Sequence, residues 1–139
     1  PVLDDGVRYM VTADQLRNLA GHFVAIGAHG KTHTPLTRAA DLGAELGGAQ
    51  AALAGHAGRV PVAMSCPHGA HDPAIVAAAH AAGYRLVFTS VPELPPATGT
   101  GDGVLGRVGF TGATITDAAG TFAPERLALH LFRKPHARA

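Results

Sequence analysis

The sequence predicts an α/β fold with a mostly parallel sheet and helices packed outside it. Helical and strand patterns alternate as α-β-α-β-α-β over residues 12–90, with the short connections typical of such folds. Hydrophobic residues make up 47% of the 139 residues and charged residues only 15%, which is a globular composition with enough apolar material for a core. We therefore expect residues 1–139 to form one domain, whole or truncated.

The first half of this alternation has clear start and stop signals. Thr12 followed by Gln15 is a capping-box pattern that predicts a helix start, with Leu16 and Leu19 on the apolar face. The short apolar run "HFVAIGA" predicts a strand over residues 22–28. A second helix is expected over residues 38–54. Its apolar side is formed by Leu42, Leu46, Ala49 and Leu53.

The second half repeats the pattern. Strands are expected over residues 59–66 and 84–90. Between them, Asp72 is a natural N-cap with Pro73 at the first helical position, which predicts a helix that ends near Gly83.

The ends of the chain are expected to be simpler. Residues 1–11 are predicted to be a connector and residues 133–139 a basic tail. A weaker strand is expected over residues 106–110, and an amphipathic helix over residues 124–132.

Composition narrows the classes of function. The formal net charge of +1 gives no general attraction to nucleic acid, and no apolar run has the length of a membrane span. Cys66 is the single cysteine, so an intrachain disulfide is excluded, and its place at the end of an apolar strand predicts a small buried filler.

Two histidine pairs follow the first two predicted strands. His29 and His33 come after the first strand, and His68 and His71 after the second. Ligands of parallel α/β folds bind at such strand ends, and neutral imidazole is a common metal ligand. His29 and His33 can converge on one ion if the loop turns back, although a catalytic site needs a further ligand. In a chain with nine histidines, a metal pair and a chance spacing both stay open.

Two longer stretches carry a resemblance. "MVTADQLRNLAGHFVAIGAHGKTHTPLT" and "VPVAMSCPHGAHDPAIVAAAHAAGYRLVFTS" resemble the polysaccharide deacetylase family, also called the NodB homology domain or carbohydrate esterase family 4, over about residues 9–90. The resemblance implies a distorted (β/α) barrel, here a partial one that corresponds to the C-terminal part of the domain. It also implies a bacterial hydrolase that removes N-acetyl groups from a carbohydrate such as an N-acetylglucosamine polymer.

The resemblance assigns roles to residues of both loops. It implies that His29 and His33 hold a divalent metal, zinc first, with cobalt, manganese or nickel as alternatives. Gly30 stands where the family has serine or threonine, which puts the rigidity of this loop in doubt.

The stretch "SCPHG" matches the family's substrate loop, in which a backbone N–H contributes to the oxyanion site. Pro67, His68 and Gly69 occupy the matching positions, and Ser65 replaces the arginine of the family. His71 is either a second contact to the site or substrate, or a plain loop residue.

The catalytic aspartates are the open point. "VLDDG" at residues 2–6 resembles the family's motif, in which one aspartate is the general base and the next a metal ligand. However, only 23 residues separate Asp5 from His29, where the family places a whole helix and another strand, so Asp4 and Asp5 fit the connector at least as well. His130 offers a general acid, but it is expected on the final helix.

Two function classes therefore stand side by side. One is a metal-dependent N-deacetylase whose activity is impaired in this chain alone. The other is a non-catalytic domain that binds carbohydrate or pairs with another subunit, because a truncated barrel leaves sheet edges that a second copy or a missing N-terminal segment would complete. The resemblance leaves the compartment open between the cell envelope and the cytoplasm.

Overall fold

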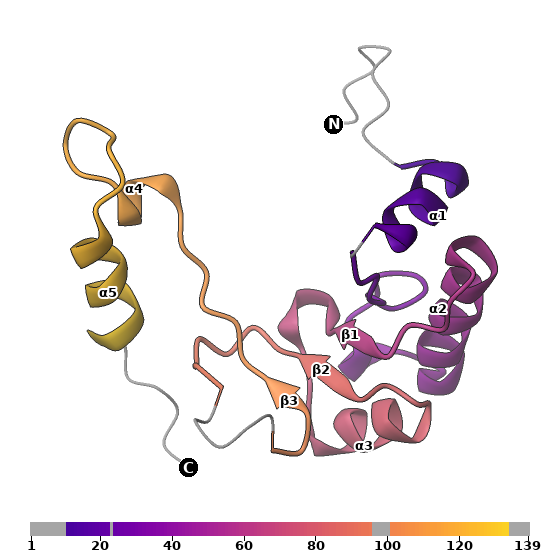
Figure 1. Ribbon diagram of the computed structural model, residues 1–139. Coiled ribbons are helices and arrows are strands. Elements are labelled where there is room, and N and C mark those ends of the chain that lie inside the picture. Colours follow the sequence, from indigo (N-terminus) through magenta and orange to yellow (C-terminus); the bar gives the residue numbers. More distant parts are fainter. Residues whose placement is uncertain (1–10, 23, 96–100, 134–139) are drawn as a thin grey trace, which may run out of the picture.

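The computed structural model describes residues 11–22, 24–95 and 101–133 (Figure 1). Asp4 and Asp5 lie outside the described residues, as do nearly all of the predicted connector and of the predicted basic tail.

A three-stranded parallel sheet lies at the centre. It consists of β1 (Ala63–Ser65), β2 (Leu86–Phe88) and β3 (Val104–Leu105), in the order β1-β2-β3. Both pairings are parallel, which confirms the predicted direction of the strands. The strands are shorter than expected, and the prediction of a strand over residues 106–110 is wrong because the pairing with β2 involves residues 104–105 instead.

The expected strand over residues 22–28 is reduced to one bridge, in which Ala28 pairs in parallel with Met64. The Ala28 N–H donates to the Ala63 carbonyl, and the Ser65 N–H donates to the Ala28 carbonyl, both at 2.9 Å. Further pairing toward the N-terminal end of β1 meets Pro61, which has no N–H to donate. The Pro61 carbonyl already accepts a hydrogen bond from Gln50 Nε2.

Helix starts follow side-chain caps. The capping box predicted at Thr12 is present before α1 (Ala13–Gly21), although Ala20 rather than Leu19 is the buried residue of that helix. Asp72 caps α3 (Pro73–Ala81) as predicted. The second helix, α2 (Leu42–Ala57), begins later than residue 38, because Asp41 caps it and residues 36–38 form a separate 3-10 turn.

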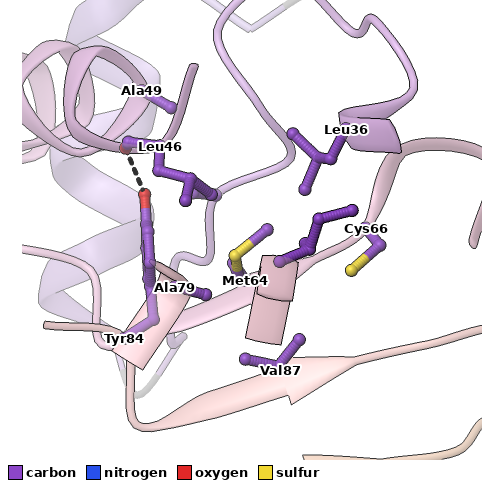
Figure 2. Packing of buried hydrophobic residues seen from close by; sticks show 10 residues of the cluster. Leu36, Leu46, Ala49, Met64, Cys66, Ala79, Tyr84 and Val87 are labelled. Carbon is purple, nitrogen blue, oxygen red and sulfur yellow. Dashed lines mark hydrogen bonds between the residues drawn. The ribbon is translucent and has the colours of Figure 1, made fainter. Parts of the chain in front are cut away.

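The core lies between one face of the sheet and helices α2 and α3 (Figure 2). Met64 and Val87 point to this side, where they meet Leu46 of α2 and Ala79 of α3. The buried Tyr84 hydroxyl donates to the Leu46 carbonyl at 2.9 Å, and burial raises the pKa of this phenol. Cys66 belongs to the same buried cluster, as predicted.

The opposite face of the sheet is less covered. Along β1 and β2 the side chains alternate, so that those next to Met64 and Val87 are only half-buried. They are Ala63, Ser65, Leu86 and Phe88. These side chains line an open cavity of about 570 Å³. The sheet therefore has one face packed on helices and one face that is hollowed.

The C-terminal part forms an arm that lies apart from the sheet in Figure 1. It contains a short α4 (Gly112–Ile115), which was not expected, and α5 (Pro124–Arg133), which was predicted; these two helices contact each other. His130 lies on α5 as predicted, and its Nε2 donates to the Gly109 carbonyl at 2.8 Å. Among the described residues, no helix has the length and apolar character needed to cross a membrane.

Candidate functional site

Two loops meet at the carboxyl end of β1. The first loop begins at His29, directly after Ala28, whose backbone is hydrogen-bonded to β1 on both sides. The second begins at Cys66, whose N–H donates to the Phe88 carbonyl at 3.0 Å. Because both loops are tied to the same strand end, the sheet itself brings the two histidine-bearing segments together.

Three imidazoles form a row where these loops meet. The ring centroids of His29 and His33 are 4.9 Å apart, and those of His33 and His68 are 4.7 Å apart. His33 and His68 both have a positive φ, 64° and 56°, which non-glycine residues adopt rarely and at some cost. Such strained conformations cluster at functional sites, and here two of them hold histidines of the same row.

His29 is oriented by the neighbouring strand. Its Nδ1–H donates to the Ser65 carbonyl at 2.8 Å, which leaves Nε2 as the nitrogen with the free lone pair. A backbone carbonyl that fixes the tautomer in this way is one of the usual partners of a metal-bound histidine. The side chain of His29 is exposed, so a ligand can reach it.

The donor set for a metal ion is incomplete in the described residues. Between residues 11 and 133, leaving aside residue 23 and residues 96–100, no three His, Cys, Asp or Glu side chains are arranged to hold an ion together. His29 and His33 are two neighbouring imidazoles, a donor type that divalent ions such as zinc accept, and His68 lies beside His33. A third ligand would have to come from elsewhere.

Glu45 of α2 organises the first loop, and the sequence analysis missed it. Its Oε2 accepts hydrogen bonds from the backbone N–H groups of Lys31 and Thr32, at 2.9 and 3.0 Å. Its Oε1 accepts one from the Thr32 hydroxyl at 2.7 Å. One sequence signal could have revealed this role of Glu45. It is a carboxylate on the buried side of α2, between Leu42 and Ala49, and a buried charge requires partners.

Gly30 fits this arrangement without the hydroxyl that the family carries there. Its φ is +71°, and a Cβ at this position would lie 3.1 Å from Pro67 Cγ and 3.2 Å from Glu45 Oε2. The three hydrogen bonds to Glu45 hold the loop instead. The doubt about loop rigidity that Gly30 raised is thus answered by a carboxylate from a different element.

The second loop turns sharply at Pro67, His68 and Gly69. Pro67 is buried, and the Gly69 N–H donates to the Cys66 carbonyl at 2.9 Å. Within the described residues the His68 N–H donates to no other group, so it is available to a bound oxygen.

His71 lies on a different side of the second loop. Its Nδ1–H donates to the Gly69 carbonyl, and its ring lines another cavity, of about 610 Å³, together with Asp72, His80 and Asp102. His29 and His33 do not line this cavity. His80 is half-buried, and its Nδ1–H donates to the Tyr84 carbonyl at 2.9 Å.

Cys66 is not placed as a nucleophile. It is fully buried, and burial raises the pKa of its thiol, although the charge of Arg107 acts in the opposite direction. A thiol in this state is a poor nucleophile at neutral pH.

The Glu45 carboxylate should make the stability of the chain depend on pH. Its hydrogen bonds, first of all the one from the Thr32 hydroxyl, hold the pKa of Glu45 below its ordinary value. A group with a lowered pKa stabilises the fold at pH values above its unfolded-state pKa, and this contribution is lost as the pH falls through the lower folded-state pKa. Urea unfolding should therefore show a fall in the free energy of unfolding below about pH 4.3.

Glu45→Gln provides the matched control. It retains the size of the side chain but cannot ionise, so the difference between wild type and variant should be larger at pH 6 than at pH 3. A difference that stays constant over this range would contradict the assigned role of Glu45.

Comparison with known proteins shows the family and the fold. The sequence matches the polysaccharide deacetylase family over residues 6–87. Among solved structures, the chain is similar to a polysaccharide deacetylase from Bacillus cereus, with a TM-score of 0.65 and 18% identity over 87% of this chain and 36% of that one. It is also similar to a Streptococcus pyogenes deacetylase in complex with acetate, with a TM-score of 0.71 and 18% identity over 87% of this chain and 50% of that one.

These structures confirm the predicted fold class. The chain spans about a third to a half of their length, which agrees with a sheet that is not closed into a barrel. No curated protein matches the sequence. Since the match to the family covers more than half of the chain, the protein belongs to the polysaccharide deacetylase family.

Proposed function

We propose that the chain carries part of the site of a metal-dependent carbohydrate N-deacetylase: two metal ligands, His29 and His33, and an oxyanion donor at His68. The observation that supports this most strongly is the hydrogen bond from His29 Nδ1 to the Ser65 carbonyl. It aims the second ring nitrogen away from the strand while His33 lies beside it. The acetate in the complex of the Streptococcus pyogenes deacetylase is the acid that N-deacetylation releases.

The reaction is hydrolysis of an amide. The oxygen of a water molecule forms a bond to the acetyl carbon, the carbon–nitrogen bond breaks, and the leaving amine takes up a proton. A bound divalent ion, zinc by preference, would act as a Lewis acid on the acetyl oxygen. The His68 N–H would donate to the same oxygen as negative charge develops on it.

The described residues do not supply a general base at this site. The nearest buried carboxylate, Glu45, is engaged in three hydrogen bonds that hold the loop, so it is not free to take a proton from water. Asp4 and Asp5 remain the candidates within the chain for both base and third ligand. We therefore propose weak metal binding and little or no turnover by this chain alone.

Zinc titration by calorimetry tests the metal pair. His29→Ala should weaken zinc binding at least tenfold, a loss of about 1.4 kcal/mol, because it removes one of two nitrogen donors. His56→Ala removes an exposed histidine at the end of α2 and should leave the affinity unchanged. Equal affinity of the wild type and His29→Ala would refute the site.

A non-catalytic role in carbohydrate binding or in pairing with a further segment is the second candidate. The half-buried apolar side chains on the open face of the sheet favour it, because this face has no helix packed on it within the described residues. Slow release of acetate from an acetylated chito-oligosaccharide that is lost in His29→Ala would favour the first candidate, and no release at any zinc concentration would favour the second. Rapid turnover by the chain alone would contradict both the impaired activity and the non-catalytic role.

A further inference from the structure

We propose that Thr32 and Thr34, anchored by Glu45, are positioning residues that clamp His33 beside His29 and so set the affinity of the histidine pair for a divalent ion. The proposal rests on the proposed function for the role of the histidines, whereas the clamp itself is a property of the metal-free chain. Neither threonine was assigned a role from the sequence.

The two threonines flank His33, and their hydroxyls meet across it. Thr32 Oγ1 and Thr34 Oγ1 are 2.8 Å apart and form a hydrogen bond. In an extended chain, residues two positions apart are separated by roughly 6.6 Å, so this contact favours a backbone that turns at the residue between them. That residue is His33, and its φ of 64° makes the turn.

The direction of these hydrogen bonds is set by the carboxylate. The Thr32 hydroxyl donates its hydrogen to Glu45 Oε1 at 2.7 Å, because an ionised carboxylate accepts hydrogen bonds and cannot donate them. A hydroxyl has a single hydrogen, so the Thr34 hydroxyl is the donor to Thr32 Oγ1. The hydrogen bonds therefore run from Thr34 through Thr32 to Glu45, across His33.

Both ends of the loop are fixed as well. Ala28 is hydrogen-bonded to β1, and the buried Leu36 belongs to the core cluster. Pro35 restricts Thr34 to an extended conformation, which limits the directions that its hydroxyl can take. Because the ends are fixed, the turn that the threonines impose falls at His33.

The clamp bears on metal binding through the conformation of His33. A positive φ costs free energy for a residue other than glycine, and the hydrogen bonds across His33 offset this cost. They keep its ring centroid 4.9 Å from that of His29. The affinity for a ligand falls with the fraction of molecules that have the binding-competent conformation. Loss of either hydroxyl should therefore weaken metal binding, although neither threonine needs to touch the ion.

Valine variants of similar shape test the clamp by zinc calorimetry. Thr32→Val removes both hydroxyl hydrogen bonds and should weaken zinc binding about five- to tenfold. Thr34→Val removes only the bond across His33 and should weaken binding about two- to fivefold.

Two controls accompany these variants. Thr37→Val changes an exposed threonine in the 3-10 turn that follows the loop, and it should bind zinc like the wild type. Thr34→Ser retains the hydroxyl and should also keep the wild-type affinity. A loss in Thr34→Ser as large as that in Thr34→Val would contradict a role of the hydroxyl and overturn the proposal.

The double variant Thr32→Val/Thr34→Val separates a clamp from two independent contributions to packing. Both single changes break the same hydrogen bond between the hydroxyls, so the double variant should bind zinc no more weakly than Thr32→Val. Additive losses would overturn the proposal, as would wild-type affinity in both single variants.

A second measurement needs no metal. In the metal-free wild type, the amide and α protons of His33 should give a strong intraresidue nuclear Overhauser effect, because a positive φ brings these two protons close together. The effect should weaken in Thr32→Val and stay strong in Thr37→Val. An unchanged effect in Thr32→Val would refute the clamp.

The two measurements distinguish the possible failures. If the wild type binds no zinc but the His33 signal weakens in Thr32→Val, the metal pair is refuted, and with it the effect on affinity, while the clamp is confirmed. If the wild type and Thr32→Val bind zinc equally well, the clamp has no effect on affinity and the metal pair stands without it.

Discussion

Leu46→Ala is expected to lower the free energy of unfolding by about 3–5 kcal/mol. Leu46 is only 1% exposed and lies where α2 meets Met64, Val87 and Tyr84 (Figure 2). Removal of its isobutyl group leaves a cavity that a sheet of three short strands has little freedom to close. This loss is a large part of the roughly 5–15 kcal/mol that stabilises a typical domain.

Leu129→Ala is the matched control for this change. It removes the same atoms from a side chain of α5 that is 53% exposed, so its effect should stay within about 0.5 kcal/mol. Urea unfolding followed by circular dichroism measures both variants. Similar losses for the two leucines would mean that α2 does not pack on the sheet as described.

Gly69→Ala should cost about 2–4 kcal/mol, the second largest effect expected. The φ of Gly69 is +70°, and a Cβ added there would overlap Ser90 Oγ and lie 2.5 Å from Ser90 Cβ. The overlap involves the Cβ as well as the hydroxyl, so the second loop must shift. Because His68 precedes Gly69, the shift would also displace the proposed oxyanion donor.

Gly58→Ala separates backbone strain from steric overlap. Gly58 also has a φ of +70°, but no atom lies within 4 Å of an added Cβ, so only the conformational cost of about 1–2 kcal/mol applies. Addition of Ser90→Gly to Gly69→Ala should recover the difference between the two glycine variants. If Gly69→Ala costs no more than Gly58→Ala, the close approach of the loop to Ser90 is wrong.

Local signals predicted the helices well. Thr12 and Asp72 begin α1 and α3 as expected, because a capping hydrogen bond is made within four residues and does not depend on the rest of the fold. The strands were predicted less well, because an apolar run indicates only that a segment is buried. Its pairing depends on another strand that is distant in the sequence. Thus residues 22–28 pair only at Ala28, and the third strand lies at residues 104–105.

The residues of the candidate site were likewise predictable from the sequence only in part. The positions of His29, His33 and His68 after strands could be predicted, because the carboxyl ends of parallel strands meet at one edge of a sheet. The roles of Glu45 and Arg107 could not, since each acts on a loop or strand end that is distant in sequence. Glu45 reaches Thr32 across 13 residues, and Arg107 reaches the Thr89 carbonyl across 18.

The sequence by itself determined the alternation of helices and parallel strands, the helix caps and the family to which the chain belongs. Only the tertiary structure decided that His29 donates to the Ser65 carbonyl, that Glu45 holds the first loop, and that Arg107 faces the open side of the sheet. The physical reason is the separation along the chain of the residues that decide each feature. Periodicity and capping are properties of neighbouring residues, whereas a tautomer, a loop conformation or a cavity wall depends on contacts between segments that only the folded chain brings together.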